Sequence, residues 1–529
     1  MSIETTPSKG QDPANELSRG TLIAACLAAC LAQAALTVPA SVSGLLQTAL
    51  KPVGNQLVWT SNAFLLPMVA LSPAFGVWGN RLGLKRLLVG GAVLITAGES
   101  VTAAGDDVHQ VWAGQAIAGV GAAALLPASL TVVTRGTGTT RARAGAFATY
   151  AAALGGGILL AQALRGAGGD DGSWRWPFAL TAGLGVLSAL LGQLLTRNSG
   201  SVYGRSLDVV GQLCIGVGLL ALLYSVVEGG AGRWSETDVI LGFLVAAVFL
   251  GLFIMVELHT PVPLLRLGLF ADRAYAVSSF AAVVGMFAYS GVVYAAGIRV
   301  GIVQDQSLSH LIGAFCLLSA FAVVLLPLTS RLLEHVSSRW TLAAGLFLIA
   351  GGAFVAAGLS ISDKSLGSIV LALTPVGIGF ALTLASTTFA VSIAPVREAG
   401  MSSAAVSMLR NLGYTVGPAI VGGIALRHAA SRLDSDLASA PLPPLAKGAV
   451  GAIADAGGPL AVNAIPQSSP AGAAHSIAFE ALGRGYSLGF TVCGIAALVA
   501  CLIAVVVRPG PGPGPEDNGS PRKARQTSA

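Results

Sequence analysis

The sequence predicts an all-α integral membrane protein with about fourteen spanning helices, and three observations lead to this fold class. Of the 529 residues, 54% are hydrophobic and only 10% are charged, whereas an average soluble domain carries about 25% charge. The mean hydropathy of the chain is +0.76. The apolar residues gather in runs of about 20, the length with which an α-helix crosses a bilayer. A bilayer favours such an apolar exterior, and water does not.

Fourteen apolar segments meet this length, and most are joined by short polar turns. Asp208 and Glu228 flank one of them and are expected at the membrane interface, where Asp208 is placed to cap its helix. The expected spans are 21–41, 57–78, 87–104, 111–134, 144–164, 177–195, 207–227, 239–256, 275–298, 309–329, 341–360, 367–393, 402–426 and 485–507.

The charges of the short loops indicate an orientation. With a cytoplasmic N-terminus, the short inner loops hold thirteen Lys or Arg residues and the short outer loops hold six. Cytoplasmic loops are enriched in these residues, so we expect a multi-pass protein of the cell inner membrane with both termini cytoplasmic. Residues 1–20 lack the pattern of a cleavable signal peptide and form one tail. The Pro- and Gly-rich residues 508–529 form a second, disordered tail.

Several other classes of protein are excluded. The net charge is +6, but the basic residues are scattered between apolar runs, so no nucleic-acid partner is expected. All six cysteines lie in apolar runs. Cys26 and Cys30 share a helix face, yet no His or acid nearby completes a ligand set, so we expect packing and no metal. The chain has no nucleophile–base pair and no phosphate-binding loop, so neither an enzyme nor a cofactor is expected.

Two features extend over longer stretches. Residues 427–484 are rich in Ala, Pro, Gly and Ser, and the orientation places them outside as a long loop with room for a short helix or two. The basic turns 80–86 and 330–339 each join closely spaced spans, which indicates a weak internal repeat. Membrane transport proteins built from related halves hold their binding site near mid-membrane, between the halves.

Five short strings stand in a fixed order on these spans. They are Gly76-Val77-Trp78-Gly79-Asn80-Arg81-Leu82-Gly83-Leu84-Lys85-Arg86; 115–123 (QAIAGVGAA) with 127–130 (PASL); 174–178 (WRWPF); Glu257 with 261–267 (PVPLLRL) and Phe270; and 410–413 (RNLG). Together they resemble the major facilitator superfamily, in its fourteen-spanner drug:proton antiporter branch. The resemblance covers nearly the whole chain.

The resemblance implies a two-bundle fold of twelve core helices plus two extra central helices. It divides the chain into an N-terminal six-helix bundle (21–200), the two extra helices with their links (201–260), and a C-terminal six-helix bundle (261–507) that includes the outer loop. It implies a secondary transporter that exports small hydrophobic substrates of the drug, antibiotic or dye type by alternating access. The implied partners are the lipid bilayer, the substrate and protons as the coupling ion.

The sequence departs from the family pattern at positions that carry charge. The family usually has Asp at the position of Asn80 and Arg at the position of Gln115. It often has an acid early in its first helix, where this chain has Cys30, Ala32 and Gln33. The antiporter signature of its fifth helix is reduced here to 155–157 (GGG), Ala161 and Gln162. The fold inference survives these departures, and the inference of proton coupling is weakened by them.

Glu99 is the candidate for proton coupling. Ionisable side chains inside a bilayer are costly and are functional candidates by default. Glu99 lies thirteen residues after Arg86, which places it about 20 Å into a hydrocarbon core about 30 Å thick. A carboxyl at this depth can exchange a proton with the outside. The alternative is that it faces a wet outer vestibule or pairs with a polar neighbour.

Arg410 lies in the inner third of the span 402–426. It can bind an anionic substrate, pair with an acid, hold a helix carbonyl or extend to the cytoplasmic face. Because the family places an Arg here whatever the substrate, the resemblance favours a structural or gating role. The candidates for a central cavity are Gln33, Tyr150, Gln162, Tyr289, Tyr294 and Arg410, and the alternative for most of them is plain packing.

Three further sets have roles that the resemblance implies. The cytoplasmic turn is expected to latch the two halves by contacts to acids or helix ends, and Asn80 weakens this latch because it has no charge. The glycines of spans 144–164 and 402–426 suit a moving contact, although close packing explains them equally well. The sets are the latch Gly76, Asn80, Arg81, Gly83, Lys85 and Arg86; the helix-4 signature Gln115 and Gly119; and the hinge residues Gly156, Gly157, Gly413, Gly417 and Pro418.

Two other functions stay open beside proton-driven export. One keeps the fold and moves lipid or another envelope component, with weak or no proton coupling. The other is a membrane sensor or scaffold that transports nothing, for which the absence of the family's charges at Asn80 and Gln115 argues.

Overall fold

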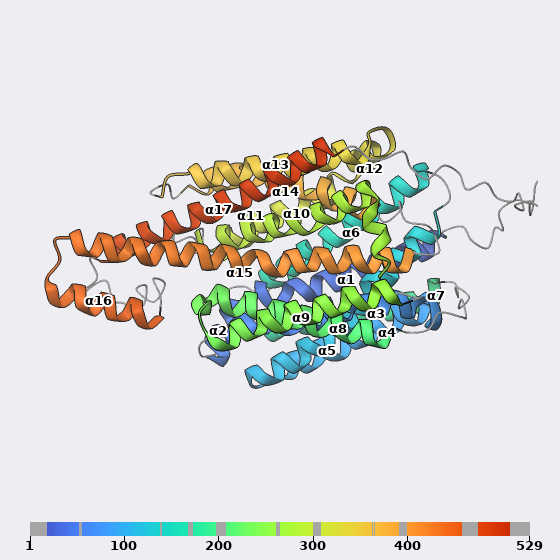
Figure 1. Cartoon of the computed structure of the whole chain (residues 1–529), viewed down its shortest axis with the longest axis horizontal. Coiled ribbons are helices and arrows are strands. Elements are labelled where there is room, and N and C mark those ends of the chain that lie inside the picture. The colour runs from blue at the N-terminus through green and yellow to red at the C-terminus, as the bar shows by residue number, and fades with distance from the viewer. Residues whose placement is uncertain are drawn as a thin grey trace, which may run out of the picture.

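The computed structural model describes residues 18–51, 56–137, 140–167, 173–196, 208–260, 265–299, 308–361, 363, 365–390, 399–457 and 474–507. Both expected tails lie almost wholly outside these ranges. The described elements are all helical, and most lie side by side along one axis (Figure 1). They are α1 (Arg19–Ser41), α2 (Ser43–Leu50), α3 (Gln56–Leu82), α4 (Leu84–Ala104), α5 (Val108–Arg135), α6 (Thr140–Ala167), α7 (Arg175–Leu195), α8 (Val209–Glu228), η2 (Gly229–Arg233), α9 (Thr237–His259), η3 (Leu267–Ala271), α10 (Arg273–Ile298), α11 (Leu308–Val324), α12 (Leu326–His335), α13 (Ser338–Gly358), α14 (Leu366–Ala390), α15 (Ala399–Ser439), α16 (Pro444–Gly457) and α17 (Ala474–Val506).

The helices follow the apolar runs and begin at recognisable caps. Among the described residues, twelve helices are long and apolar enough to cross a membrane. The two remaining expected spans fall on α11, which has 17 residues, and on α15. Asp208 accepts a hydrogen bond of 2.8 Å from the Gly211 amide, so its expected capping role is confirmed. Asp107 and Asp272 cap α5 and α10 in the same way.

The described spans pack as two groups and a pair. Helices α1, α3, α4, α5, α6 and α7 contact one another and form the first group. Helices α10, α11, α13, α14, α15 and α17 form the second group. Helices α8 and α9 pack against each other, and α8 also lies against α3. The groups meet where α15 contacts α3 and α5, and where α11, α12 and α14 contact α6.

Equivalent close contacts recur in the two groups. A Cβ added to Gly121 of α5 would lie 2.6 Å from the backbone oxygen of Gly91 on α4. In the second group, a Cβ added to Gly379 of α14 would collide with the backbone oxygen of Gly345 on α13. Glycine lets two helix backbones approach this closely. The internal repeat indicated by the two basic turns therefore has a counterpart in the packing of α4–α5 and α13–α14.

The expected outer loop 427–484 is helical over much of its length, which corrects its boundaries. Helix α15 continues to Ser439 and has 41 residues, about 60 Å of helix and about twice the hydrocarbon thickness. Helix α17 begins at Ala474, and α16 lies beside these extensions at one end of the molecule (Figure 1). Leu433, Leu437, Val450 and Ala478 are buried together there. The expected span 309–329 is likewise interrupted, because α12 starts anew at Leu326 with a proline in its first turn.

Candidate functional site

One face of α15 carries Arg410 towards the first group of helices. Ser403, Ser407 and Arg410 are separated by four and three residues, so they share this face. The guanidinium of Arg410 lies close enough to the phenol of Tyr150 on α6 for an electrostatic interaction. Tyr150 in turn lies 3.0 Å from the hydroxyl of Ser129 on α5, measured between the two oxygens. This face of α15 therefore belongs to the contact between the two groups.

Aromatic side chains continue this contact. The phenol of Tyr414, one turn after Arg410, faces the hydroxyl of Thr37 on α1. Tyr289 of α10 interacts with Tyr414 and with the hydroxyl of Ser319 on α11. The rings of Tyr289 and Phe380 of α14 are stacked with their centroids 3.9 Å apart. A chain of side-chain contacts thus runs from Tyr414, one turn after Arg410 on α15, to α10, α11 and α14.

The polar atoms on this face of α15 are buried and unpaired. Arg410 is 1% exposed, and none of its three guanidinium nitrogens has a hydrogen-bond partner within the described ranges. The hydroxyls of Ser403 and Ser407 and both amide atoms of Asn411 share this property. A buried charge without a partner costs several kcal/mol. Hydrophobic packing alone therefore does not account for Arg410, which reaches neither an acid nor a helix carbonyl among the residues described.

The other cavity candidates are placed differently. Gln33 of α1 is 2% exposed, its Nε2 is unpaired in the described part of the chain, and it lies against Gly157 of α6. Tyr294 faces Tyr486 of α17, with ring centroids 6.2 Å apart, and so lies inside the second group. Gln162 is half-buried near the end of α6. The structure thus brings Tyr150 and Arg410 together. Tyr289 is linked to them only through Tyr414, and Tyr294 lies inside the second group.

Glu99 is fully buried between α4 and α5. It is 0% exposed, and neither of its carboxylate oxygens has a hydrogen-bond partner among the described residues. Its carboxyl faces the side chain of Gln115, whose Nε2 donates a hydrogen bond of 3.1 Å to the hydroxyl of Thr102. Helix α4 packs against α5, α7, α1 and α3, all in the first group. Glu99 therefore lies within the first group, five residues before α4 ends.

The helix-4 signature packs α5 against its neighbours. A Cβ added to Gly119 would collide with the backbone oxygen of Phe64 on α3. Gln115 is 0% exposed and brings no charge beside Glu99. The substitution of the family's Arg by Gln therefore leaves this carboxyl without a cationic neighbour on α5 at this position.

Two glycines of the expected latch, Gly76 near the end of α3 and Gly83 in the turn before α4, have clear structural roles. A Cβ added to Gly76 would collide with Ala404 and lie 2.8 Å from the backbone oxygen of Gly400, both on α15. Gly83 has φ of +86°, which L side chains rarely adopt, and it starts α4. The turn therefore depends on Gly83 for its shape, and the approach of the two groups depends on Gly76.

The cations of this turn make no ion pair with any described acid. Arg81 and Arg86 are exposed and Lys85 is half-exposed. The side chain of Asn80 and residues 391–398, which follow α14, lie outside the described residues. An ion pair that the latch prediction did not include joins Arg141 of α6 to Glu334 of α12, with Nε and Oε2 3.8 Å apart.

The predicted hinge glycines divide into two kinds. A Cβ on Gly157 would collide with the backbone oxygen of Cys30 on α1, and one on Gly413 with that of Val283 on α10. A Cβ on Gly417, the residue before Pro418, would lie 2.6 Å from the backbone oxygen of Phe287. These contacts lie within one group and have the geometry of close packing. Gly156 differs, since its nearest neighbour is Val323 of α11 at 3.7 Å.

A polar network around Glu228 was not predicted. Trp59 Nε1 of α3 donates a hydrogen bond of 2.7 Å to Glu228 Oε1, and Arg233 Nη1 lies 2.6 Å from Glu228 Oε2. Arg233 also reaches Asp238 at 3.1 Å, which accepts a hydrogen bond of 2.8 Å from Tyr224. The sequence predicted only that Glu228 lies at the membrane interface, without naming its partners. The network could have been predicted from Trp59, Glu228, Arg233 and Asp238, which can bond to one another and all lie near the ends of spans.

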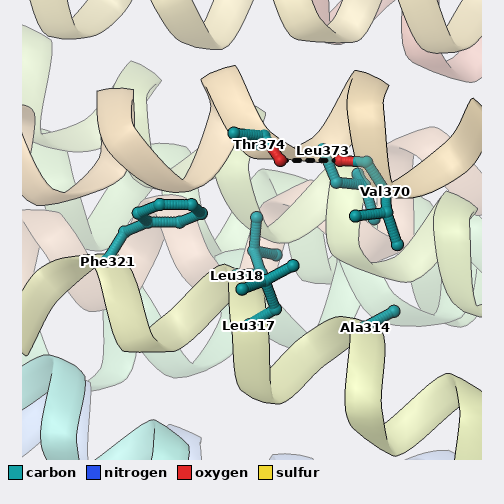
Figure 2. A pocket seen from close by; sticks show the side chains of 7 residues that line it. All are labelled: Ala314, Leu317, Leu318, Phe321, Val370, Leu373 and Thr374. Carbon is teal, nitrogen blue, oxygen red and sulfur yellow. Dashed lines mark hydrogen bonds between the residues drawn. The ribbon is translucent and has the colours of Figure 1, made fainter. Parts of the chain in front are cut away.

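A pocket between α11 and α14 does not have the features of a binding site. Its empty volume is only about 150 Å³ even with open solvent included, so it has little room for a ligand. Figure 2 shows that its lining is apolar apart from Thr374, whose hydroxyl donates a hydrogen bond of 2.8 Å to Val370 O on its own helix. Among the described residues, no three His, Cys, Asp or Glu side chains gather as a metal site would require.

The chain is similar to known transport proteins. The sequence model described as Major Facilitator Superfamily matches residues 23–418. The chain is 27% identical over 384 residues to the multidrug resistance protein Stp of Mycobacterium tuberculosis (72% of this chain, 71% of that protein). It is 23% identical over 509 residues to the tetracenomycin C resistance and export protein of Streptomyces glaucescens (92% of this chain, 91% of that protein).

Solved structures share the fold. The human organic anion transporter MFSD10 superposes with a TM-score of 0.60 at 13% identity, over 93% of this chain and all of that one. The proton:xylose symporter XylE superposes with a TM-score of 0.57 at 14% identity, over 91% of this chain and 94% of that one. The expected all-helical two-bundle fold is thereby confirmed.

Proposed function

The chain belongs to the major facilitator superfamily, and from this premise we propose that it exports hydrophobic or amphipathic small molecules in exchange for protons. It is a multi-pass membrane transporter rather than an enzyme. The drug- and antibiotic-export functions in the names of its relatives support export as the direction of transport. The loop charges support an inner-membrane protein with cytoplasmic termini.

The observation that carries proton coupling is the environment of Glu99. Its carboxyl is 0% exposed and unpaired within the described residues. A buried carboxylate without a partner is costly, and binding a proton removes most of that cost. When the surroundings open, water solvates the carboxylate and the proton leaves. Glu99 lies about 8 Å of helix before the end of α4 at Ala104, so in the proposed orientation its path to water leads outward.

Alternating access requires contacts between the groups to open at one end at a time. At one end, Gly76 of α3 lies against Ala404 of α15. At the other, Gly230 of η2 lies against Ala419 and Gly423 of α15, and the preceding helix α8 packs on α3 of the first group. Arg410 and Tyr414 belong to the part of α15 between these contacts, and Tyr150 of α6 interacts with Arg410 there. We assign the substrate site to this middle part, where both groups supply side chains.

The proposal is tested with purified protein in proteoliposomes under an imposed pH gradient. Two lipophilic fluorescent dyes serve as probes, one cationic and one anionic, and empty liposomes are the control for passive permeation. We expect at least one dye to move against its concentration gradient, and collapse of the pH gradient to stop this movement. Movement that is insensitive to the pH gradient would refute proton coupling. No movement of either dye by folded protein would refute export of this class of compound.

A further inference from the structure

We propose that the α15 face around Arg410 binds the negatively charged group of an amphipathic substrate, such as a carboxylate or sulfonate. This inference rests on the export function proposed above, because it names the chemical class that the site accepts. The anion-binding face consists of Ser403, Ser407 and Arg410. It is distinct from Glu99, which lies between α4 and α5.

The donors of this face match an anionic group. A guanidinium presents its N–H groups as a planar fork that fits both oxygens of a carboxylate or sulfonate. The hydroxyls of Ser407 and Ser403 lie one and two turns before it, respectively, on the same side of the helix and supply further donors. Arg410 is 1% exposed and both serines are 0% exposed, yet these polar atoms are unpaired among the described residues. A bound anion would accept hydrogen bonds from several of these donors at once.

The charges around this face select against cations. The titratable group that interacts with Arg410 is Tyr150 of α6, a neutral phenol that brings no negative charge. Glu99 interacts with Gln115 instead. No described acid therefore neutralises Arg410, and a cationic ligand at this site would face an uncompensated positive charge in a low-dielectric region. A ligand anion supplies the missing counter-charge.

The aromatic residues beside this face suit the rest of the ligand. Tyr414 lies one turn after Arg410 and interacts with Tyr289, whose ring is stacked on that of Phe380. Aromatic surfaces pack well against planar apolar molecules. The preferred ligand is thus an aromatic body that carries one anionic group.

The test compares ligands that differ only in charge. Purified full-length protein in detergent is titrated with 1-pyrenebutyrate and with its methyl ester, and binding is read from energy transfer between tryptophan and pyrene. The inference predicts that the carboxylate binds at least 10-fold more tightly than the ester. Equal affinities in the wild-type protein would overturn it, without the need for any variant.

Variants test which residues cause the preference for the carboxylate over the ester. Arg410→Gln is expected to bring the carboxylate to the affinity of the ester, and Arg410→Lys is expected to keep part of the preference. The double variant Ser403→Ala, Ser407→Ala keeps the charge and is expected to weaken only the carboxylate, by about 3- to 10-fold, the loss of one to two ordinary hydrogen bonds. Ser402→Ala is the matched control, because Ser402 points to Tyr275 of α10. A preference that persists in Arg410→Gln would overturn the assignment.

The same samples separate this inference from the proposed function. Gradient-driven dye movement without a carboxylate preference would leave export standing and refute the anion site. A carboxylate preference that depends on Arg410, in a protein that moves neither dye, would leave the anion site standing and refute gradient-driven export. If Arg410→Gln does not fold, the serine double variant and the ligand pair on wild-type protein still decide the question.

Discussion

The indole Nε1 of Trp59 on α3 donates a hydrogen bond of 2.7 Å to Glu228 at the end of α8. Near the start of α8, Gln212 donates one of 3.1 Å to the backbone oxygen of Ala70 on α3. The contact of the following turn with α15 is of another kind, because there Gly230 packs against the backbone of Ala419. Polar bonds thus hold α8 to the first group, while close backbone packing joins the turn at Gly230 to α15.

Replacing Trp59 by Phe removes the donor and keeps an aromatic ring. Glu228 is 3% exposed, and a hydrogen bond to a charged group contributes about 1.5–3 kcal/mol. We expect Trp59→Phe to lower the free energy of unfolding by roughly that amount, measured by denaturation in detergent. Trp78→Phe is the control, because Trp78 contacts Phe75 edge-on and its indole nitrogen has no hydrogen bond among the described contacts. Equal losses in the two variants would show that the Trp59 hydrogen bond is not what stabilises this contact.

Two adjacent glycines of α6 give a matched pair. A methyl group on Gly157 would collide with the backbone oxygen of Cys30, whereas one on Gly156 has its nearest neighbour at 3.7 Å. Overpacking costs about 1–3 kcal/mol, and alanine in an open helical position gains about 0.5–1 kcal/mol over glycine. Gly157→Ala is therefore expected to lower the unfolding midpoint, and Gly156→Ala to keep or raise it. The reverse order would contradict the described packing of α6 on α1.

Two buried arginines are expected to respond in opposite ways to replacement by Met. Both are 1% exposed. Arg299 donates hydrogen bonds to the backbone oxygens of Leu359 and Ser360 at 2.9 and 2.7 Å, so its loss is expected to cost about 1.5–3 kcal/mol. Arg410 is unpaired in the described ranges, so Arg410→Met is expected to leave stability unchanged or to raise it by about 1–4 kcal/mol. A clear loss of stability in Arg410→Met would indicate a structural role.

The turn between α13 and α14 has a defined pH dependence. The pKa of Asp363 is held below its usual value by the Ser368 hydroxyl, and further by the Ser365 amide and Arg299. A depressed folded-state pKa means that the stabilising contribution is present above the unfolded pKa, about 3.9, and is lost as the pH falls through the folded value. At pH 7 the wild type is expected to melt at a higher temperature than Asp363→Asn, and this difference should shrink towards pH 3. A constant difference would refute this account.

Hydropathy predicted the spans well, because lipid imposes a length and an apolar composition on every helix that crosses it. It did not predict where α15 and α17 end outside the bilayer. Ala429, Leu433 and Leu437 recur every four residues and are buried at the extended end of α15. This pattern was present in the sequence, but the run is too polar to resemble a membrane span.

The candidate site was predicted in part. Glu99 and Arg410 stand out in sequence because charge inside a span is rare. Which groups face them depends on how distant segments meet, such as Tyr150 of α6 and Arg410 of α15, and local sequence does not encode this. The hydrogen bond between Trp59 and Glu228 joins residues 169 positions apart. The sequence of either span by itself therefore does not predict this bond.

The most direct test of the central claim separates proton coupling from substrate handling in Glu99→Gln. Reconstituted protein is assayed with a transported dye in two ways, by accumulation driven by a pH gradient and by exchange of dye at equal pH on both sides. Because Gln is close in size to Glu but does not release a proton, the account predicts that driven accumulation is lost while exchange continues at near the wild-type rate. Undiminished accumulation in Glu99→Gln would contradict the claim that this carboxyl carries the proton.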